Sequence, residues 1–306
     1  MKDYPLVSII TVNYNQFEFT VAMIESLSQL TYPNVEIIVV DNASTEDVLW
    51  DSIKSASVEI IYAERNLGFA GGNNLGIKKA KGKYLLFLNN DTTVVPDLLE
   101  PLVQFCENNS NVGAVGPQIV YADHPSRIQF SGSRLNRYTS QIKWMNLDLA
   151  VENHKDIVEL SDLVHGAAML VPTKVIKEVG MMSEEFFLLY EEFDWCERMK
   201  EAGYSLFYIG ASKVFHKVSM TMKNSPIKSY YMTRNRILFI QRNFTGLQRY
   251  CSLLFVLLIG VPKSLFQLGL KREWKLIRVT LKGVFSHLKR KPVKEYPKKE
   301  FIQALK

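Results

Sequence analysis

The sequence predicts an α/β protein in which helices cover both faces of a mostly parallel central sheet. Near-continuous apolar runs of strand length recur along the chain, which is typical of strands buried on both faces. Segments with apolar residues at helical spacing lie between these runs, and this alternation favours parallel pairing. The composition agrees, because 306 residues with 47% hydrophobic and 22% charged residues can bury a sizeable core and are unlike a disordered or collagenous chain.

The first half of the chain supplies most of this alternation. Residues 6–12 form the first predicted strand, and residues 17–30 the first predicted helix, because apolar residues recur there every three or four positions. Four further strands and one further helix are predicted, the strands at 35–40, 58–62, 84–88 and 112–120 and the helix at 98–106. Ligands bind at the carboxyl ends of strands in such sheets, so the polar residues that follow these strands are candidate site residues.

The second half of the chain is less regular. We expect residues 121–160 to make an excursion over the sheet and residues 164–171 to be apolar and buried. The remaining predicted elements are two helices and two short strands, the helices at 191–202 and 226–243 and the strands at 204–209 and 213–215.

Residues 251–270 differ in character, because this apolar stretch carries a single charge, Lys263. A membrane-spanning helix needs about 20 mostly apolar residues, and here Pro262 and Lys263 interrupt the run near its middle. Three interpretations stay open: a buried core helix, a membrane-surface or re-entrant segment, and a true span. We favour the second.

The charge distribution supports a membrane surface. Residues 271–306 hold 12 Lys/Arg and 3 Asp/Glu, a net charge of +9, whereas the first 270 residues hold 25 and 28, a net charge of −3. Basic residues beside an apolar helix are attracted to anionic cytoplasmic lipid by about 1 kcal/mol each. We therefore expect a main domain at 1–245, and a segment at 246–306 that attaches it to the cytoplasmic face of a membrane, with no nucleic-acid partner.

Two segments near predicted strand ends carry candidate binding residues. Asp91 follows the strand 84–88, and an oxygen ligand at such an edge suits a hard divalent cation that bridges a diphosphate. The alternative is a cap of the next helix, but Pro96-Asp97 is the better start of that helix, which leaves Asp91 free. The glycine-rich stretch 66–76 follows the strand 58–62 and allows backbone to approach a ligand, or simply makes a tight turn. The sequence contains neither G-x-G-x-x-G nor a Walker loop.

An acidic cluster opens the predicted helix 191–202. Glu191, Glu192 and Asp194 are favoured there by the helix dipole alone. Large apolar neighbours and like charges also raise the proton affinity of a carboxylate, so one of the three fits a general base in a cleft. His216 lies 24 residues after Glu192 and, taken alone, is an ordinary core or surface histidine.

These motifs occur in an order that resembles the family 2 inverting glycosyltransferases with the GT-A fold. The branch most similar is the bacterial rhamnosyltransferase-like one, which builds cell-surface polysaccharide. The resemblance covers roughly residues 5–245, and its motifs are residues 7–15 (VSIITVNYN), 39–44 (VVDNAS), 66–76 (NLGFAGGNNLG), 87–92 (FLNNDT), 166–169 (GAAM), 191–198 (EEFDWCER), His216 and Arg234-Asn235.

The resemblance implies roles for particular residues on the donor side. It assigns the nucleotide pocket to residues near the first two strand ends, namely Thr11, Asn13, Tyr14 and Asp41. Asn66 and Gly68 correspond to the donor wall. Asn89 and Asp91 stand at the family's D-x-D motif, and because the first acid is Asn here, Mg²⁺ or Mn²⁺ would depend on Asp91, with His216 completing the site.

The resemblance also implies the reaction. A sugar on a nucleoside diphosphate, dTDP-L-rhamnose or a UDP-sugar, is transferred with inversion to a hydroxyl of a saccharide or polyprenyl-diphosphate-linked acceptor. Glu192 stands at the base position, where the family usually has the Asp of a Glu-Asp pair, so Glu192 and Asp194 both stay candidates. Arg234 is expected to help to neutralise the departing diphosphate. The alternatives are a non-catalytic nucleotide-sugar-binding module and a metal-dependent nucleotidyltransferase.

Overall fold

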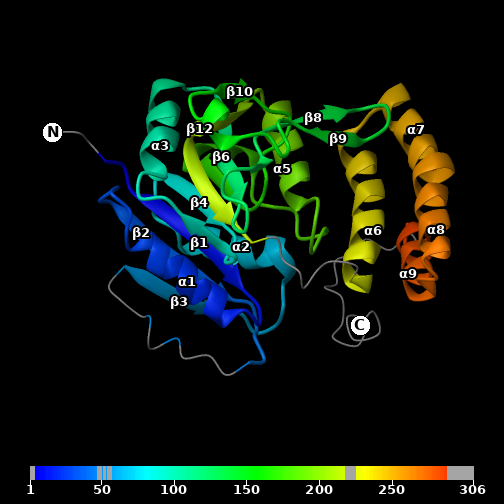
Figure 1. Ribbon diagram of the computed structural model, residues 1–306, viewed down its shortest axis with the longest axis horizontal. Helices are drawn as coiled ribbons and strands as arrows, with labels where there is room; N and C mark the ends of the chain where they lie inside the picture. Colours follow the sequence, from blue (N-terminus) through cyan, green and yellow to red (C-terminus); the bar gives the residue numbers. More distant parts are fainter. Residues whose placement is uncertain (1–3, 47–49, 51–52, 54–56, 218–224, 288–306) are drawn as a thin grey trace.

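The computed structural model describes residues 4–46, 50, 53, 57–217 and 225–287 (Figure 1). Its centre is a ten-stranded sheet in which eight strands follow the order β10-β12-β6-β11-β4-β1-β2-β3, with β5 paired to β12 and β7 to β6. The strands of this sheet are β1 (Val7–Asn13), β2 (Val35–Asp41), β3 (Val58–Tyr62), β4 (Tyr84–Leu88), β5 (Thr92–Val94), β6 (Val112–Tyr121), β7 (Ile128–Phe130), β10 (Val158–Leu160), β11 (Ala168–Pro172) and β12 (Ser205–His216). A separate hairpin consists of β8 (Ser133–Asn136) and β9 (Gln141–Trp144).

Helices pack on both faces of this sheet, as Figure 1 shows. They are α1 (Phe17–Leu27), α2 (Gly68–Lys79), α3 (Leu99–Asn108), α4 (Thr173–Val179), α5 (Glu191–Glu201), α6 (Pro226–Asn243), α7 (Gly246–Phe255), α8 (Val261–Leu270) and α9 (Trp274–Phe285). One large apolar cluster contains Ile10 and Phe87, and a second contains Ile9 and Leu86. Because adjacent strand residues point to opposite faces, each face of the sheet has its own core, and the α/β prediction is confirmed.

The direction of the strands is more mixed than the sequence predicts. β4, β1, β2 and β3 are parallel, as expected, and β6 is parallel to β12. β11, however, runs antiparallel to both of its neighbours, β4 and β6. An apolar run indicates burial on both faces but carries no information about direction, so the pattern at 164–171 could not show this reversal.

Several boundaries also differ from the predictions. The helix expected at 17–30 ends at Leu27. The strands expected at 204–209 and 213–215 are one strand, β12, with a register irregularity between Ile209 and Lys213. The excursion at 121–160 contains β7, the β8–β9 hairpin and β10.

The glycine-rich stretch forms helix α2 rather than an open loop. A Cβ atom on Gly72 would lie 2.8 Å from Val12 Cγ1, and one on Gly76 would lie 2.4 Å from Ile10 Cγ2. These two glycines therefore serve close packing of α2 on β1, and the expectation that they bring backbone to a ligand is wrong for them.

The C-terminal helices form a separate layer beside the sheet domain, at the right of Figure 1. α9 packs against α6, and Tyr230, Tyr231, Leu276 and Val279 form their shared core with Phe187. α7 continues through the π-helical segment Val256–Gly260 into α8, which makes one apolar helix from Gly246 to Leu270. Only 6% of its most apolar window is buried, so the interpretation as a core helix is wrong.

Candidate active site

The carboxyl ends of β1 and β2 meet at one edge of the sheet, where Asn13 pairs directly with Asp41. Asn13 is fully buried, and its Nδ2 donates to Ser44 Oγ at 3.0 Å while its Oδ1 accepts from Thr20 Oγ1 at 2.8 Å. Asn90 Nδ2 also donates to Thr20 Oγ1, at 3.1 Å. Asn13 therefore connects the β2 edge, α1 and the segment after β4.

Asp41 is held from two sides. Its Oδ1 accepts from the Ser44 backbone N–H at 3.0 Å, and its Oδ2 accepts from Trp50 Nε1 at 2.9 Å. Each carboxylate oxygen has a second lone pair, so the group can still accept one further hydrogen bond per oxygen. Thr11 is fully buried, and its Oγ1 has no hydrogen-bond partner within the described part of the chain, whereas Tyr14 is 39% exposed at the rim.

Asn42 joins the end of β2 to the start of α2. Its Nδ2 donates to Asn66 Oδ1 at 3.1 Å and to the Gly68 carbonyl at 3.0 Å, while its Oδ1 accepts from the Leu67 N–H at 2.9 Å. Gly68 has a φ of +71°, and a Cβ there would lie 2.1 Å from the Phe187 carbonyl oxygen. Glycine is required here because a side chain would be strained and would displace residue 187.

Asp91 and His216 lie together because β5 pairs with β12, in a register that places His216 opposite Thr92. Asp91 Oδ1 is 3.2 Å from His216 Nε2, yet this oxygen accepts no hydrogen bond from the described residues. His216 Nδ1 lies 2.9 Å from Gln129 Oε1, which can only accept. A neutral ring that donates through Nδ1 presents a lone pair at Nε2 toward the carboxylate, so a cation fits between the two atoms.

The segment 165–167 connects this pair to the opposite side of the site. The His165 and His216 ring centroids are 6.2 Å apart, and the Asn89 N–H donates to the Ala167 carbonyl at 3.0 Å. A Cβ on Gly166 would lie 3.4 Å from Glu192 Oε1. The segment thus contacts Asn89, His216 and Glu192, which brings Asn89, Asp91, His216 and Glu192 around one region.

The carboxyl group of Glu192 is buried and has a raised pKa. Burial raises its pKa to about 7, against the backbone N–H groups of Glu192 and Tyr190, which favour the charged form. Its Oε2 is buried and has no hydrogen-bond partner in the described chain. Burial and the neighbouring charge of Glu192 also raise the pKa of Glu191 well above its usual value.

Asp194, the other candidate base, is committed to ion pairs. Its Oδ2 accepts from Arg198 Nε at 3.0 Å, and its Oδ1 accepts from Arg242 Nε and Asn243 Nδ2, both at 3.0 Å. The side chain is fully buried. Three donors occupy the two carboxylate oxygens, and two of these donors tie α5 to α6, an arrangement typical of a structural residue.

Arg234 does not face a diphosphate in this structure. It is 4% exposed, and its Nη1 donates to the Glu185 carbonyl at 2.8 Å and to Asn235 Oδ1 at 2.6 Å. Asn235 in turn donates to three carbonyls of the segment before α5. Sequence reasoning gave Arg234 a role beside the departing diphosphate, whereas in the structure Arg234 and Asn235 both hydrogen-bond to the segment before α5.

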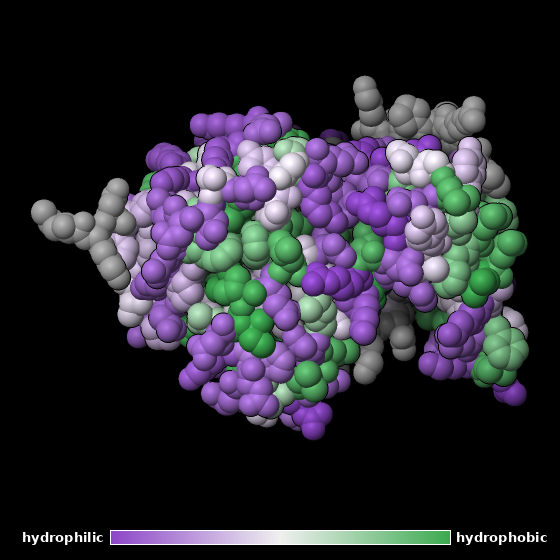
Figure 2. Space-filling view, turned by 90° about the horizontal axis from the view of Figure 1, so that it is seen from above, coloured by the Kyte–Doolittle hydropathy of each residue, from purple (hydrophilic) through white to green (hydrophobic). Residues whose placement is uncertain are grey.

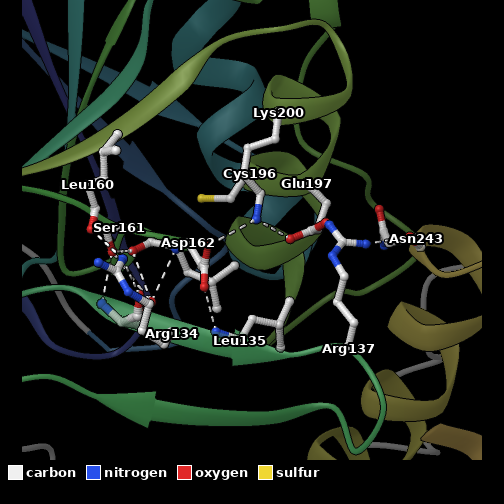
Figure 3. A network of polar contacts seen from close by, with 12 residues as sticks. Arg134, Leu135, Arg137, Leu160, Ser161, Asp162, Cys196, Glu197, Lys200 and Asn243 are labelled. Carbon is white, nitrogen blue, oxygen red and sulfur yellow. Dashed lines mark hydrogen bonds and ion pairs between the residues drawn. The ribbon is translucent and has the colours of Figure 1, made fainter. Parts of the chain in front are cut away.

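A second polar network joins α5 to the β8–β9 hairpin (Figure 3). Arg137, in the turn of the hairpin, pairs with the buried carboxylate of Glu197, which also pairs with Lys200 Nζ at 2.6 Å. Ser252 of α7 donates to the Arg137 carbonyl at 2.7 Å. The hairpin thus links the helix that carries Glu192 to the start of the apolar helix.

The sequence motifs gave no role to several residues of this region, although Asn42, Asn90 and Asn235 stand within them. They share a supporting role around the predicted residues, and they are Asn42, Trp50, Asn90, Gln129, His165 and Asn235. Asn42 and Asn90 lie next to residues that the motifs did single out. The partners of Gln129 and Asn235 are more than 40 residues away in sequence, so no local pattern could reveal them.

Several solved structures have a similar fold. The GalNAc-T7 structure with UDP, GalNAc and Mn²⁺ aligns with a TM-score of 0.61 at 18% identity and covers 71% of this chain and 44% of that one. The mannosyltransferase PcManGT from Pyrobaculum calidifontis, with GDP-Man and Mn²⁺, aligns with a TM-score of 0.58 at 12% identity and covers 99% and 79%. These likenesses show the GT-A fold that the sequence predicts.

Two curated relatives match a little less than half of this chain. An uncharacterized glycosyltransferase of Haemophilus influenzae is 33% identical over 138 residues, which cover 45% of each chain. The Escherichia coli UDP-Glc:alpha-D-GlcNAc-diphosphoundecaprenol beta-1,3-glucosyltransferase WfaP is 33% identical over 145 residues, 46% of this chain and 57% of that one. Both matches cover less than two thirds of the relative's own length.

The family follows from the match that covers most of the sheet. The family model described as glycosyl transferase family 2 matches residues 8–170, which is more than half of the chain and runs from β1 into β11. The chain belongs to glycosyl transferase family 2, as its motifs predict.

Proposed function

We propose that this protein transfers a sugar from a nucleoside diphosphate to an acceptor hydroxyl with inversion, and that Glu192 is the general base. The observation that carries this proposal is a buried, unpartnered carboxylate oxygen on a residue whose pKa is raised to about 7. A general base works best when its pKa lies near the operating pH. Because the Asp194 oxygens are taken up by Arg198, Arg242 and Asn243, we assign Asp194 the role of holding α5 in place.

The donor would bind along the carboxyl ends of β1, β2 and β4. The Asp41 carboxylate can accept the imide N–H of a uracil or thymine ring, which favours a UDP-sugar or dTDP-L-rhamnose. Thr11, Asn13, Tyr14, Asn66, Gly68 and Asn89 would line this pocket, with Thr11 and Asn13 acting from beneath its surface because both are fully buried. WfaP supports a uridine nucleotide, since its name gives UDP-Glc as donor.

Mg²⁺ or Mn²⁺ would be held by Asp91 and His216. No cluster of three His, Cys, Asp or Glu side chains able to hold a metal occurs among the described residues. The facing acceptor atoms Asp91 Oδ1 and His216 Nε2, 3.2 Å apart, nevertheless supply two ligands, and diphosphate oxygens and water can supply the rest. A bound divalent cation neutralises the charge that develops on the leaving diphosphate.

The chain's own residues would then carry out the transfer. Gln129 fixes the tautomer of His216, and Asn13 and Asn90 fix the edge against which the nucleotide lies. Glu192 accepts the proton of the acceptor hydroxyl while that oxygen attacks the anomeric carbon, and the bond from that carbon to the diphosphate oxygen breaks. A single displacement of this kind inverts the anomeric centre.

A transfer assay with a donor panel tests the proposal. Wild-type protein is incubated with UDP-, dTDP- and GDP-sugars, Mn²⁺ and a polyprenyl-diphosphate saccharide, and the nucleoside diphosphate released and the glycosylated lipid are both measured. We expect turnover with a uridine or thymidine donor and an inverted product linkage. Binding of donor without any turnover would instead indicate the non-catalytic module. If pyrophosphate is added and the nucleotide sugar is converted to a nucleoside triphosphate and a sugar 1-phosphate, the protein is a nucleotidyltransferase.

The apolar helix would attach the enzyme to a membrane, where a lipid-linked acceptor lies. Its exposed apolar residues form what we call the α7–α8 surface, which consists of Leu247, Tyr250, Leu254, Leu257, Leu258, Ile259, Phe266 and Leu270. Figure 2 shows hydrophobic residues gathered at this end of the molecule. The rest of the basic segment, residues 288–306, lies outside the described residues. An apolar surface and basic residues together provide the two signals that stable attachment needs.

Sedimentation with lipid vesicles tests this attachment. The double variant Leu258→Glu/Phe266→Glu places charges on side chains that are 69% and 68% exposed, so folding should persist. We expect it to lower the fraction bound to anionic vesicles at least tenfold, because each buried apolar side chain contributes roughly 1.5–3 kcal/mol. Leu160→Glu, at a position that is 55% exposed on β10, is the control and should bind as wild type does.

The salt dependence and the oligomeric state complete the vesicle test. High salt should weaken binding of the wild-type protein without abolishing it, because salt screens the basic residues and leaves the apolar contact. If the double variant sediments like the wild type but changes the protein from dimer to monomer, the α7–α8 surface contacts a second copy rather than lipid.

A further inference from the structure

The backbone immediately before α5 is held in an unfavourable conformation. Phe187, Leu189 and Tyr190 have φ angles of 63°, 70° and 76°, although none of them is glycine. Left-handed backbone costs a residue with a side chain roughly 1–2 kcal/mol. Three such residues within four positions persist only where the surrounding structure fixes them, and strain of this kind is concentrated at functional sites.

One side chain on α6 fixes most of this segment. Asn235 is fully buried, and its Nδ2 donates to the carbonyls of Phe186 at 2.8 Å, Leu188 at 2.8 Å and Leu189 at 2.7 Å. Two amide hydrogens thus serve three acceptors. The Arg234 guanidinium donates to Asn235 Oδ1 at 2.6 Å, which settles which end of the amide faces the segment.

The segment also determines where α5 begins. The Asp194 N–H donates to the Tyr190 carbonyl at 2.9 Å, which is the first helical hydrogen bond after the left-handed residues. Glu192 lies in that first turn, beside Gly166. A change in the backbone of 187–190 would therefore rotate the first turn and move the Glu192 carboxyl group.

We propose that Asn235 is a positioning residue for Glu192, which acts by holding residues 186–190 in the strained conformation that starts α5. It touches neither donor nor acceptor in this proposal. The inference rests on the proposed role of Glu192 as the base, and it adds a residue on another helix that determines how well the base is placed.

The same segment has a second support that provides a matched control. Asn74 of α2 is 2% exposed, and its Nδ2 donates to the Met182 carbonyl at 2.9 Å and to Glu184 Oε1 at 3.0 Å. It therefore holds the chain upstream of the left-handed residues. Asn74→Asp makes the same chemical change as Asn235→Asp at a similar depth, without loosening 186–189.

The direct test is the titration of Glu192 by ¹³C NMR of labelled glutamate carboxyls, assigned with Glu192→Gln. Of the titratable groups close to it, Tyr190 and Cys196 have pKa values raised by burial to about 12. Burial and the charge of Glu192 also raise the pKa of Glu191, so its signal is assigned separately with Glu191→Gln. We expect Asn235→Asp to lower the midpoint of Glu192 from about 7 by at least one unit, because a loosened turn exposes the carboxyl group. Arg234 Nη1 already donates to the Oδ1 atom of residue 235 and compensates the negative charge that the variant adds. Asn74→Asp should leave the midpoint unchanged.

Kinetics provide the second measurement. We expect Asn235→Asp to lower kcat by about 10–100-fold, as misplacement of a base does, while calorimetry shows donor affinity within threefold of wild type. Adding Leu189→Gly should restore kcat at least threefold, because glycine adopts left-handed backbone without strain, even though it lowers overall stability further. Should Asn235→Asp fail to fold, Asn235→Ser, which keeps one donor, takes its place with a smaller expected effect.

The outcomes separate the two proposals. If Asn235→Asp and Asn74→Asp lose kcat in proportion to their loss of Tm, and Glu192 titrates alike in both, Asn235 is merely structural and the inference is wrong. If the wild-type protein transfers no sugar, the proposed function fails, and the carboxyl titration still decides whether Asn235 positions Glu192.

Discussion

On the proposed donor side, Asn13, Asp41 and Asn42 are held by hydrogen bonds to neighbouring segments, although Thr11 Oγ1 and Asp91 Oδ1 are buried without a partner in the described chain. On the proposed base side, the adjacent residues Glu191 and Glu192 both keep a buried carboxylate oxygen without a partner there. Asn13, Asp41 and Asn42 each make two or more hydrogen bonds to neighbouring segments. The base side adds left-handed backbone at Phe187, Leu189 and Tyr190. One side therefore resembles a preformed binding surface, and the other combines left-handed backbone with desolvated carboxyl groups around the proposed base.

This difference suits the two tasks of a glycosyltransferase, which are nucleotide binding and proton transfer. Binding a nucleotide needs groups fixed in advance, so that little ordering accompanies binding. Proton transfer near neutral pH needs a carboxyl group whose charged form is disfavoured, and burial without partners achieves that. The 165–167 segment contacts both sides and sets their separation.

Of the variants considered, Glu192→Gln should have the largest effect on turnover. Glu192→Gln keeps the shape of the side chain and removes the proton acceptor, so kcat should fall by about 10²–10⁴ while donor affinity stays close to that of wild type. Steady-state transfer assays and calorimetry measure the two quantities.

Asp194→Asn is the contrasting variant on the same helix. It leaves Arg198 and Arg242 without their shared partner, and we expect a loss of stability of about 1–3 kcal/mol, because both arginines keep some contact with solvent. Chemical denaturation measures this loss. Abolished turnover in Asp194→Asn at full stability, with Glu192→Gln still active, would exchange the roles that we give the two carboxylates.

A smaller effect is expected on the donor side, at Asp91. Asp91→Ala removes one of the two atoms that face each other across the candidate cation site, and donor affinity in the presence of Mn²⁺ should fall by about 10–100-fold, as loss of one charged ligand does. Calorimetry with and without EDTA measures the metal-linked part. If wild type and Asp91→Ala bind the donor equally well, both with and without EDTA, then Asp91 and His216 do not hold a cation for the donor.

The donor side could be predicted from the sequence more fully than the base side. Strands β1, β2 and β4 are continuous apolar runs that end in Asn13, Asp41 and Asn89-Asn90-Asp91, so burial and position are both visible in a short stretch. On the base side, the sequence indicates the acidic cluster but not which carboxylate is free. That depends on Arg198, Arg242 and Asn243, and two of these lie almost 50 residues further along the chain.

The left-handed backbone before α5 could not be predicted from the sequence either. The strain at Phe187, Leu189 and Tyr190 has no signal in residue type, because ordinary apolar residues occupy positions that favour glycine. The available signal was Asn235 itself, a polar residue near Ile237, Leu238 and Phe239 in a helix that is mostly buried. A buried asparagine in such a helix must find hydrogen-bond partners, although the sequence does not say which.

The smallest effect that tests the comparison is the pH dependence of stability contributed by Glu192. Its pKa in the folded protein is raised by burial to about 7, above the value of 4.5 for an ordinary glutamate. The folded state therefore binds this proton more tightly than the unfolded chain does, and the resulting stability is complete below pH 4.5 and lost as the pH rises through 7. Between these limits the wild-type protein should lose up to about 3 kcal/mol relative to Glu192→Gln, which carries no titrating group there.

Urea denaturation at pH 5 and pH 8 measures this difference. The control is Glu25→Gln, an exposed position on α1, and it should track the wild type at both pH values. The kcat of the wild type should fall over the same range as the pH drops below about 7, because protonated Glu192 cannot accept the hydroxyl proton. A stability difference between wild type and Glu192→Gln that is the same at pH 5 and pH 8 would mean that Glu192 is solvated, and the contrast between the two sides of the site would then rest on backbone strain alone.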